Sequence, residues 1–206
     1  MSNEIDPDIR TVLEYLHSHL EGLIRFDENV IPIKIVIDQE GRIVAPVMVA
    51  MLTSGDTVLH MPDEEDESLH LMVTLEAFEE TGVDGELADR WQIYHGEPDD
   101  VRWAIMHIDA ARLNGLFFDG DALLIPNSLA GSEAAICRWA NEELTEEMKK
   151  YCFEKNGVEL NDPRLVGVDP LGFDVRGRFR VVRLASPEYL ADEEAAKSVL
   201  ARLCGK

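Results

Sequence analysis

The sequence predicts an α+β protein in two parts, an antiparallel β-barrel-like domain of about six strands (residues 1–128) and a smaller helix-hairpin-helix α+β domain (residues 129–206). Three observations support this fold class. Apolar and polar residues alternate in several short segments, as in strands with one buried face. Short turn signals separate these segments, which is typical of antiparallel sheets. After Pro126-Asn127-Ser128 the apolar spacing becomes helical.

The first element is expected to be a helix. Asp6 can cap it and Pro7 is tolerated in its first turn. Apolar residues then recur at helical spacing, namely Ile9, Val12, Leu13, Leu16 and Leu20. Gly22 is expected to end this helix.

Strands are expected to follow from Val30 onward, since Ile31, Ile33, Ile35 and Ile37 alternate with other residues. The expected strands cover residues 30–37, 42–52, 57–61, 69–78, 101–108 and 112–118. A further extended segment is expected at residues 122–125, and a short helix at residues 86–94. Pro62 ends one strand and precedes five consecutive carboxylates, at residues 63–67, that must form a solvated loop.

The second domain is expected to begin with one long helix, because apolar residues are spaced four apart at Ile136, Ala140, Leu144, Met148 and Cys152. Asp169-Pro170-Leu171-Gly172 has proline and glycine in turn positions and predicts a hairpin between residues 165–168 and 173–175. A further strand is expected at residues 179–184, and a final helix at residues 192–203.

The composition is strongly acidic, with 41 Asp and Glu against 19 Lys and Arg and a formal charge of -22. Such a charge repels phosphate backbones and anionic lipids, so neither nucleic acid nor membrane surfaces are expected as partners. The N-terminus lacks the basic and apolar regions of a signal peptide. No apolar run approaches the roughly 20 residues that span a bilayer. Three cysteines without close pairing fit a reducing cytoplasm, which is the expected location.

Familiar catalytic motifs are absent. The chain has no Walker-type phosphate loop, no Gly-x-Ser-x-Gly and no His-Glu-x-x-His, so no set of catalytic residues is indicated. His60 and His70 flank the acidic loop and could ligate a metal with Asp63 or Glu64. We prefer the structural interpretation of these residues and expect no metal site.

The tail LVGVDPLGFDVRGRFRVVRL, followed by the helical EEAAKSVLARL, resembles the C-terminal domain of haem-utilisation proteins and the plant glutamyl-tRNA reductase-binding protein. These proteins belong to the pyridoxamine 5'-phosphate oxidase-like split barrels, many of which bind flavin mononucleotide (FMN). The segments DDVRWAIMHIDAARLNGLFF and RWQIYHGEP are similar to the same family's paired strands and short helix. The resemblance implies a split barrel, a homodimer, and FMN or haem as the cofactor.

Flavin-binding members of such barrels carry basic and hydroxyl side chains after the third strand, whereas this chain has MPDEEDES there. Like-charge repulsion between a carboxylate and a flavin phosphate costs on the order of 1 to 4 kcal/mol per close pair. If flavin binds, Lys34 is the expected phosphate cation, with Thr53 and Ser54 as hydroxyl and main-chain donors. For haem, the resemblance implies a histidine ligand, and His17 beside the apolar stripe of the first helix is a candidate.

Two functions therefore stay open. One is a flavin- or haem-linked oxidoreductase of unknown substrate, built as a homodimer. The alternative is a cofactor-free binding or regulatory dimer that has lost the flavin phosphate site and acts on a protein partner. Cations around the cofactor groove distinguish the two, because a phosphate or propionate needs them and an adaptor does not.

Overall fold

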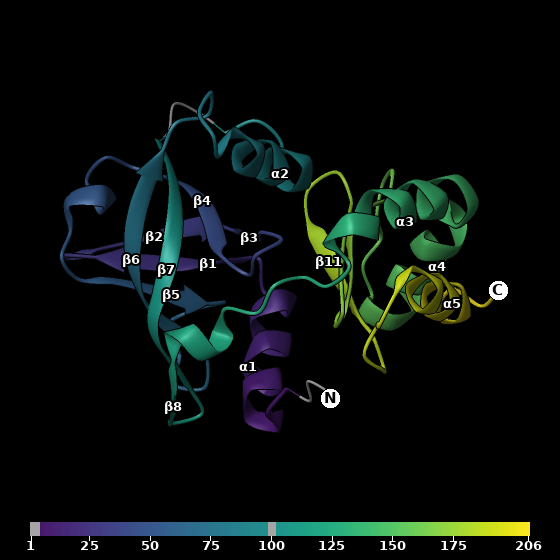
Figure 1. Ribbon diagram of the computed structural model, residues 1–206, viewed down its shortest axis with the longest axis horizontal. Coiled ribbons are helices and arrows are strands. Elements are labelled where there is room, and N and C mark those ends of the chain that lie inside the picture. Colours follow the sequence, from purple (N-terminus) through teal and green to yellow (C-terminus); the bar gives the residue numbers. More distant parts are fainter. Residues whose placement is uncertain (1–4, 99–101) are drawn as a thin grey trace. The chain divides into compact units, whose positions relative to one another are not determined.

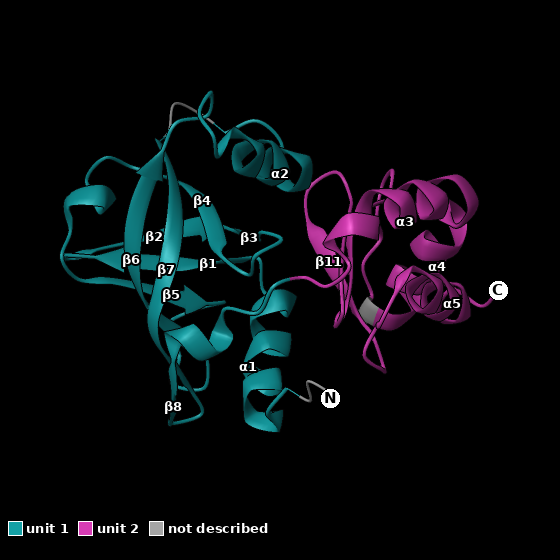
Figure 2. Ribbon diagram, viewed as in Figure 1, with its two compact units in different colours: residues 1–126 teal, residues 127–206 magenta. Residues whose placement is uncertain are grey.

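The computed structural model describes residues 5–98 and 102–206. It divides into two compact units, residues 1–126 and residues 127–206 (Figure 2). The helices of the first unit are α1 (Pro7–Ser18), the 3-10 helix η1 (Met51–Thr53), α2 (Gly85–His95) and the 3-10 helix η2 (Gly120–Leu123). Its strands are β1 (Glu21–Phe26), β2 (Asn29–Lys34), β3 (Val36–Ile37), β4 (Ile43–Val47), β5 (Thr57–Met61), β6 (Leu69–Phe78), β7 (Arg102–Leu113) and β8 (Leu116–Asp119).

One antiparallel sheet forms the body of the first unit (Figure 1). Its strands run in the order β2-β1-β5-β6-β7-β4-β3, and β8 also pairs with β7. The two ends of this order, β2 and β3, are joined in the chain by Ile35 alone. The sheet must therefore curl until its edges meet, and this geometry is consistent with a split barrel. The sheet has eight strands rather than the six expected.

The additional strand β1 lies where the end of the first helix was expected. That prediction for Gly22 was wrong, because α1 ends at Ser18 and Gly22 lies within β1. A Cβ atom on Gly22 would lie 2.3 Å from the carbonyl oxygen of His60 on the neighbouring strand. Glycine is needed here for close approach of two strands and does not end a helix.

The break expected between residues 108 and 112 was also wrong, because β7 continues to Leu113. In the pairing with β6, Asp109 has no register partner, since Met72 pairs with Ala110 and the next residue pairs with Ile108. Asp109 thus forms a β-bulge, which bends a strand without ending it. Its carboxylate accepts a hydrogen bond from Thr74 Oγ1 at 2.9 Å. The chain instead reverses at residues 114–115, where φ is positive at both positions.

The bounds of the other elements differ less between the prediction and the structure. The expected strand at residues 42–52 is shorter, because β4 ends at Val47 and η1 follows. The extended segment expected at residues 122–125 is instead largely the 3-10 helix η2. Strands β5 and β6 have the predicted bounds, and the predicted helix at 86–94 is α2 with one more residue at each end.

Helix α2 is fastened to the seam between β2 and β3 by three side chains. Trp91 Nε1 donates to the carbonyl oxygen of Lys34, and His95 Nε2 is bonded to that of Ile35, each at 2.9 Å. Arg90 Nε donates to the carbonyl oxygen of Ile37, also at 2.9 Å. These bonds satisfy main-chain acceptors at the point where the strand ladder is interrupted.

The second unit contains α3 (Ala130–Glu143), α4 (Thr145–Asn156), β9 (Arg164–Asp169), β10 (Gly172–Arg176), β11 (Val181–Ala185) and α5 (Glu193–Leu203). The single long helix expected here is two helices, because Leu144 has φ -128° and interrupts the helical backbone. The strands form one antiparallel sheet in the order β11-β10-β9. The strands expected at residues 165–168, 173–175 and 179–184 are β9, β10 and β11, and the expected final helix is α5, so the structure differs from the prediction mainly in the division of the first helix.

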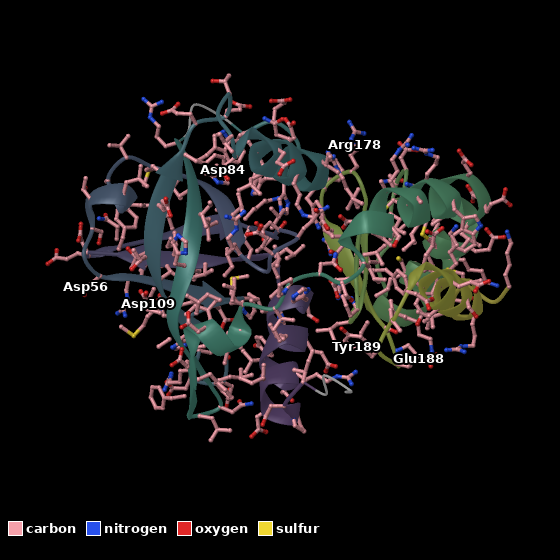
Figure 3. The ribbon with its side chains drawn as sticks, viewed as in Figure 1. Asp56, Asp84, Asp109, Arg178, Glu188 and Tyr189 are labelled. Carbon is pink, nitrogen blue, oxygen red and sulfur yellow. The ribbon has the colours of Figure 1, made fainter. Side chains whose placement is uncertain are left out.

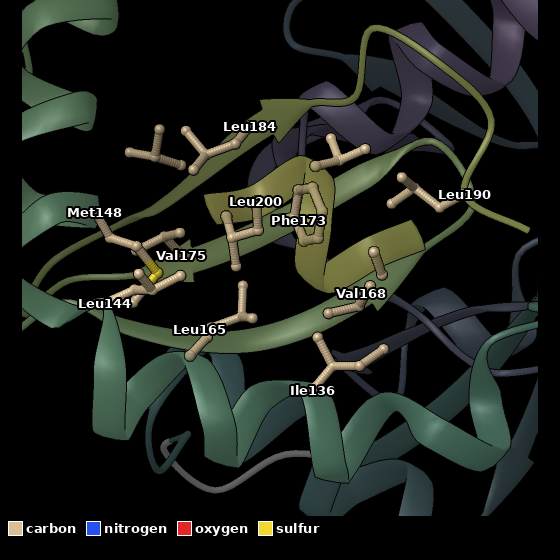
Figure 4. Packing of buried hydrophobic residues seen from close by; sticks show 14 of the residues in the cluster. Ile136, Leu144, Met148, Leu165, Val168, Phe173, Val175, Leu184, Leu190 and Leu200 are labelled. Carbon is tan, nitrogen blue, oxygen red and sulfur yellow. The ribbon is translucent and has the colours of Figure 1, made fainter. Parts of the chain in front are cut away.

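The core of the second unit surrounds Phe173, which is fully buried (Figure 4). Apolar residues from α3, α4, β9, β11 and α5 pack in the same cluster, including Ile136, Met148, Leu165, Leu184 and Leu200. Arg183 is also buried in this unit. Its Nη2 lies 2.7 Å from Asp169 Oδ1 and its Nη1 lies 3.1 Å from Asp174 Oδ1. The two carboxylates satisfy the guanidinium that the fold removes from water.

Candidate functional site

The strands of the first unit carry a groove of about 510 Å³ on the sheet face opposite Leu59 and Leu71, two buried core residues. We call it the outer-face groove. Its lining combines cations, carboxylates and apolar side chains: Arg25, His70, Arg112, Asp27, Asp56, Val58, Met72, Ala110, Ala111 and Phe117. Asp56 is seen at the surface of this unit in Figure 3. The volume lies within the range of about 300–1,000 Å³ that is usual for small-molecule sites.

Strand pairing explains why these residues meet. Alternate residues of a strand share a face, and register partners on neighbouring strands lie side by side. His60 of β5 pairs with His70 of β6, which pairs with Arg112 of β7. Arg112 pairs in turn with Phe117 of β8. Residues from four strands thus form one row across the outer face.

A second row lies two residues along the same strands. Arg25 of β1 pairs with Val58, Val58 with Met72, and Met72 with Ala110. Arg25 and Arg112 are therefore three strand spacings apart, or about 14 Å between their main chains across the sheet. The guanidinium groups of Arg25 and Arg112 thus lie on either side of a surface that includes the apolar residues Val58 and Met72.

A hydrogen-bonded network holds the Arg112 end of the groove. Arg112 Nη2 lies 3.2 Å from Asp66 Oδ1 and 3.2 Å from His70 Nδ1. His70 Nε2 lies 2.9 Å from the carbonyl oxygen of Glu65. A carbonyl only accepts and a guanidinium only donates, so Nε2 of His70 carries the hydrogen and Nδ1 accepts from Arg112. The acidic loop at residues 63–67 thus reaches the groove through Asp66.

His60 lies beside His70 on the neighbouring strand and is almost completely buried, with a side chain that is 5% exposed. The two imidazole rings meet edge to face with centroids 4.5 Å apart. Neither ring nitrogen of His60 has a hydrogen-bond partner, and Glu64 Oε1 is 3.8 Å from Nε2, beyond hydrogen-bonding distance. Burial lowers the pKa of His60, and the neighbouring His70 acts in the same direction.

The Arg25 end of the groove carries a free cation beside two acids. Arg25 is exposed, and within the described residues its side chain has neither a hydrogen bond nor an ion pair. Asp27 and Asp56 line the same end of the groove. This end can therefore accept an anion at Arg25, although the two carboxylates weaken the local positive potential.

The three residues predicted to bind a flavin phosphate do not come together. Lys34 is paired with Glu21 at 3.0 Å, and the register places it at the end of the β1–β2 hairpin opposite the connecting turn. Thr53 is exposed in η1 and donates to the carbonyl oxygen of Ala50. Ser54 lies near that turn, since its hydroxyl donates to Asp27 Oδ1 at 3.0 Å.

Six residues of strand thus separate Lys34 from Ser54, a span of about 20 Å. Only Ser54 of the three contacts a residue that lines the groove. The binding of a cofactor by Lys34, Thr53 and Ser54 stays a prediction.

Arg25 and Arg112 were not selected from the sequence as candidate site residues. The sequence predicts a helix end at Gly22 and a strand only from Val30, so it gives Arg25 no position on a strand. It predicts a separate strand beginning at Arg112 and does not show that Arg112 lies beside His70. Cations at outward strand positions, in a chain with only 19 Lys and Arg, were the available signal.

No metal site is found within residues 5–98 and 102–206. There, no group of three or more His, Cys, Asp and Glu side chains could hold an ion. His70 uses both ring nitrogens in the network above, so it has no free nitrogen with which to join His60 and Asp63 or Glu64 around an ion. His17, the haem ligand candidate, is half-buried on α1.

None of the described helices is long and apolar enough to cross a membrane.

Comparisons with known proteins establish the fold and leave the function open. No family model matches the chain. An uncharacterized protein of Arabidopsis thaliana is 28% identical over an alignment of 85 residues that covers 38% of this chain. The chain spans 17% of the length of that curated relative.

Among solved structures, a protein of unknown function from Agrobacterium tumefaciens has a TM-score of 0.74 at 15% identity and covers 99% of both chains. A haem-binding protein from Mycobacterium smegmatis has a TM-score of 0.48 at 13% identity, covering 97% of this chain and 96% of its own. A candidate pyridoxamine 5'-phosphate oxidase from Listeria innocua has a TM-score of 0.40 at 11% identity, covering 53% of this chain and 97% of its own. Both of these TM-scores are below 0.5, so the shared fold rests on the Agrobacterium structure.

Proposed function

We propose that this chain is a pyridoxamine 5'-phosphate oxidase-like split-barrel protein whose outer-face groove binds an anionic, planar cofactor, FMN or haem. The observation that supports this most directly is the placement of Arg25, His70 and Arg112 on one face of a chain that otherwise carries a large negative charge. A phosphate or carboxylate bound there gains charge-assisted hydrogen bonds from guanidinium donors. The activity that we propose with this cofactor is FMN- or haem-linked oxidoreduction of an unknown substrate.

The distance across the groove favours a cofactor over a single small anion. A ligand that contacts both guanidinium groups has to extend across much of the roughly 14 Å between the two main chains. Met72 and Phe117, which are 57% and 78% exposed, offer apolar surface between or beside them. A planar ring system with an anionic tail matches this sequence of apolar and cationic surface.

Ligand titration of the Arg25→Gln variant tests the proposal. FMN and hemin are titrated separately into the unmodified chain and the variant, with binding followed by calorimetry and visible absorption. The dissociation constant of the bound cofactor is expected to rise about tenfold, because one charge-assisted contact is lost. Arg138→Gln is a matched control, since Arg138 is exposed on α3 and its side chain has no hydrogen bond or ion pair among the described residues.

Two results contradict the proposal. Neither FMN nor hemin binds the unmodified chain at micromolar concentrations, or one binds equally well to the Arg25 and Arg138 variants. The second result would place the cofactor away from the outer-face groove.

The alternative is a cofactor-free binding or regulatory dimer. Two exposed apolar side chains that line the outer-face groove favour it, namely Met72 of β6 and Phe117 of β8. Exposed apolar side chains on one surface are typical of protein interfaces. The acids Asp27 and Asp56 in the groove also oppose a phosphate ligand. Sedimentation of the unmodified chain and of Phe117→Asp tests whether this surface forms a dimer. The titrations above separate the two functions, because only the alternative requires that neither FMN nor hemin binds.

A homodimer is part of both functions and stays a prediction. The cytoplasmic location and the division into domains at residues 1–128 and 129–206 are likewise predictions. Separate expression of the two segments, followed by thermal unfolding of each, tests whether both fold independently.

A further inference from the structure

The second unit carries a cationic surface that the proposed cofactor site does not use. Four arginines gather where the turn at residues 177–180 and the adjoining strand ends meet: Arg164, Arg176, Arg178 and Arg180. Phe179 lies at this turn and is 75% exposed, with the Arg178 guanidinium carbon 5.2 Å from its ring centroid. Figure 3 shows Arg178 at the surface of the second unit. We call these five residues the arginine patch.

The charges of the arginine patch are largely uncompensated. Of its members, Arg164, Arg178 and Arg180 have side chains without a hydrogen bond or ion pair among the described residues. Arg164 and Arg176 are register partners on β9 and β10, so two like charges face each other across the sheet. Many other cations of this chain are paired, for example Arg42 with Asp38 and Arg202 with Glu188. Because the chain has about twice as many acidic as basic residues, unpaired arginines at one place indicate a surface that binds an anion.

A small cleft beside the turn limits the size of what can bind. The cleft has a volume of about 230 Å³ and lies between the turn and residues 157–161. Val158 and Leu160 provide apolar lining, and Glu159 is its one acidic member. The volume is below the range of about 300–1,000 Å³ that is usual for cofactors and drug-sized ligands. It suits one or two side chains of an extended segment.

We propose that the arginine patch docks an acidic segment of a partner protein, with carboxylates on Arg178 and Arg180 and an apolar side chain in the cleft beside Phe179. The planar guanidinium fork matches a carboxylate with two parallel hydrogen bonds. Nucleic acid is the less suitable occupant, because its closely spaced phosphates experience the repulsion of the whole chain at -22. A short segment with a few carboxylates experiences less of it.

Fluorescence anisotropy with labelled probes tests the proposal. The first probe is a short peptide in which Glu and Leu alternate, the second has Gln in place of each Glu, and the third is a single-stranded oligothymidylate of similar length. The unmodified chain is expected to bind the Glu-Leu peptide and not the Gln-Leu peptide. Arg178→Gln and Arg180→Gln are each expected to weaken binding about three- to tenfold.

Two further variants separate docking from general charge attraction. Phe179→Ala is expected to weaken binding without any change in charge, because it removes the apolar contact beside the cleft. Arg138→Gln changes the same charge elsewhere on the second unit and is expected to leave binding unchanged. All four side chains are exposed, so thermal unfolding of each variant should match that of the unmodified chain.

Three outcomes overturn the proposal. Equal binding of the peptide by the Arg178, Phe179 and Arg138 variants assigns it to general charge, and tighter binding of oligothymidylate assigns the patch to nucleic acid. Self-association of the unmodified chain that Arg178→Gln abolishes assigns the patch to a second copy. None of these outcomes depends on whether FMN or hemin binds the outer-face groove.

Discussion

Arg112 Nη2 lies 3.2 Å from His70 Nδ1, and the opposite nitrogen of the same ring lies 2.9 Å from the carbonyl oxygen of Glu65. One imidazole thus connects strand β7 to the acidic loop between β5 and β6. The loop is also held internally, because Asp63 Oδ1 accepts bonds from Ser68 Oγ and the Glu65 main-chain N–H. A segment of consecutive carboxylates is therefore held next to Arg112, which lines the outer-face groove.

Substitution of His70 is expected to loosen this loop. His70→Phe keeps a planar ring but removes both hydrogen bonds, which is expected to cost about 1–3 kcal/mol of unfolding free energy. Hydrogen exchange at the amides of residues 63–68 should accelerate. His107→Phe is the matched control, because His107 is an exposed histidine of β7 whose side chain is bonded to Glu76 and which is distant in register from the loop. Equal exchange in the two variants would contradict the connecting role of His70.

Asp66 competes with any anion for Arg112. Its side chain is 96% exposed and lies 3.2 Å from Arg112 Nη2, so its removal frees the guanidinium with little effect on packing. We expect Asp66→Asn to lower the dissociation constant of FMN about two- to fivefold. Glu67→Gln removes the same charge from the same loop without a contact to Arg112. If both variants change affinity equally, loop charge alone and not the Asp66 contact determines it.

His60 makes folding sensitive to acid. Its pKa is lowered by burial and by His70, Arg25 and Arg112, against the opposing effect of Glu64. As the pH falls below the ordinary histidine value of about 6.5, the unfolded chain takes up a proton before the folded chain does. The His60 contribution to stability is therefore complete above that pH and is lost below it.

Urea unfolding at about pH 7.5 and about pH 5.5 tests this pH dependence. The His60→Phe variant should lose less stability between the two conditions than the unmodified chain, because phenylalanine cannot be protonated. An equal loss in both proteins would show that other groups account for the acid sensitivity.

Removal of Arg183 is expected to destabilise the second unit strongly. Burial acts to lower the pKa of Arg183, but the carboxylates of Asp169 and Asp174 outweigh it and the pKa is raised. Arg183→Met leaves these two carboxylates buried without their cation, at a cost of about 3–5 kcal/mol in unfolding free energy. Addition of Asp169→Asn and Asp174→Asn should restore most of the loss. A triple variant no more stable than the single one would contradict this explanation.

Local sequence signals located the elements that are bounded by distinctive residues. Strand β5 ends at Met61 because Pro62 follows, and β6 shows clear alternation of buried and exposed residues at its start. The signals failed where long-range packing decides the outcome. Gly22 looks like a helix end but allows β1 to approach His60, and Asp109 looks like a turn but forms a bulge.

The candidate site depends even more on long-range pairing. Lys34, Thr53 and Ser54 were chosen for their chemistry, and sequence distance alone could not show that β1 and β2 form a hairpin with Lys34 at its far end. Arg25, His70 and Arg112 come together only through the register of β1, β5, β6 and β7. That register is fixed by which residues enter the core, a property of the whole sheet.

The one-residue link at Ile35 also limits how the barrel can open. A chain that passes through a single residue can separate Lys34 and Val36 by at most about 7 Å between Cα atoms, so β2 and β3 cannot swing apart as two flaps. The side chains of Arg90, Trp91 and His95 hold the carbonyl groups on either side of this link. These carbonyl groups are therefore not available to pair with a strand of another molecule. The bonds thus protect the two edges of the curled sheet from edge-to-edge aggregation.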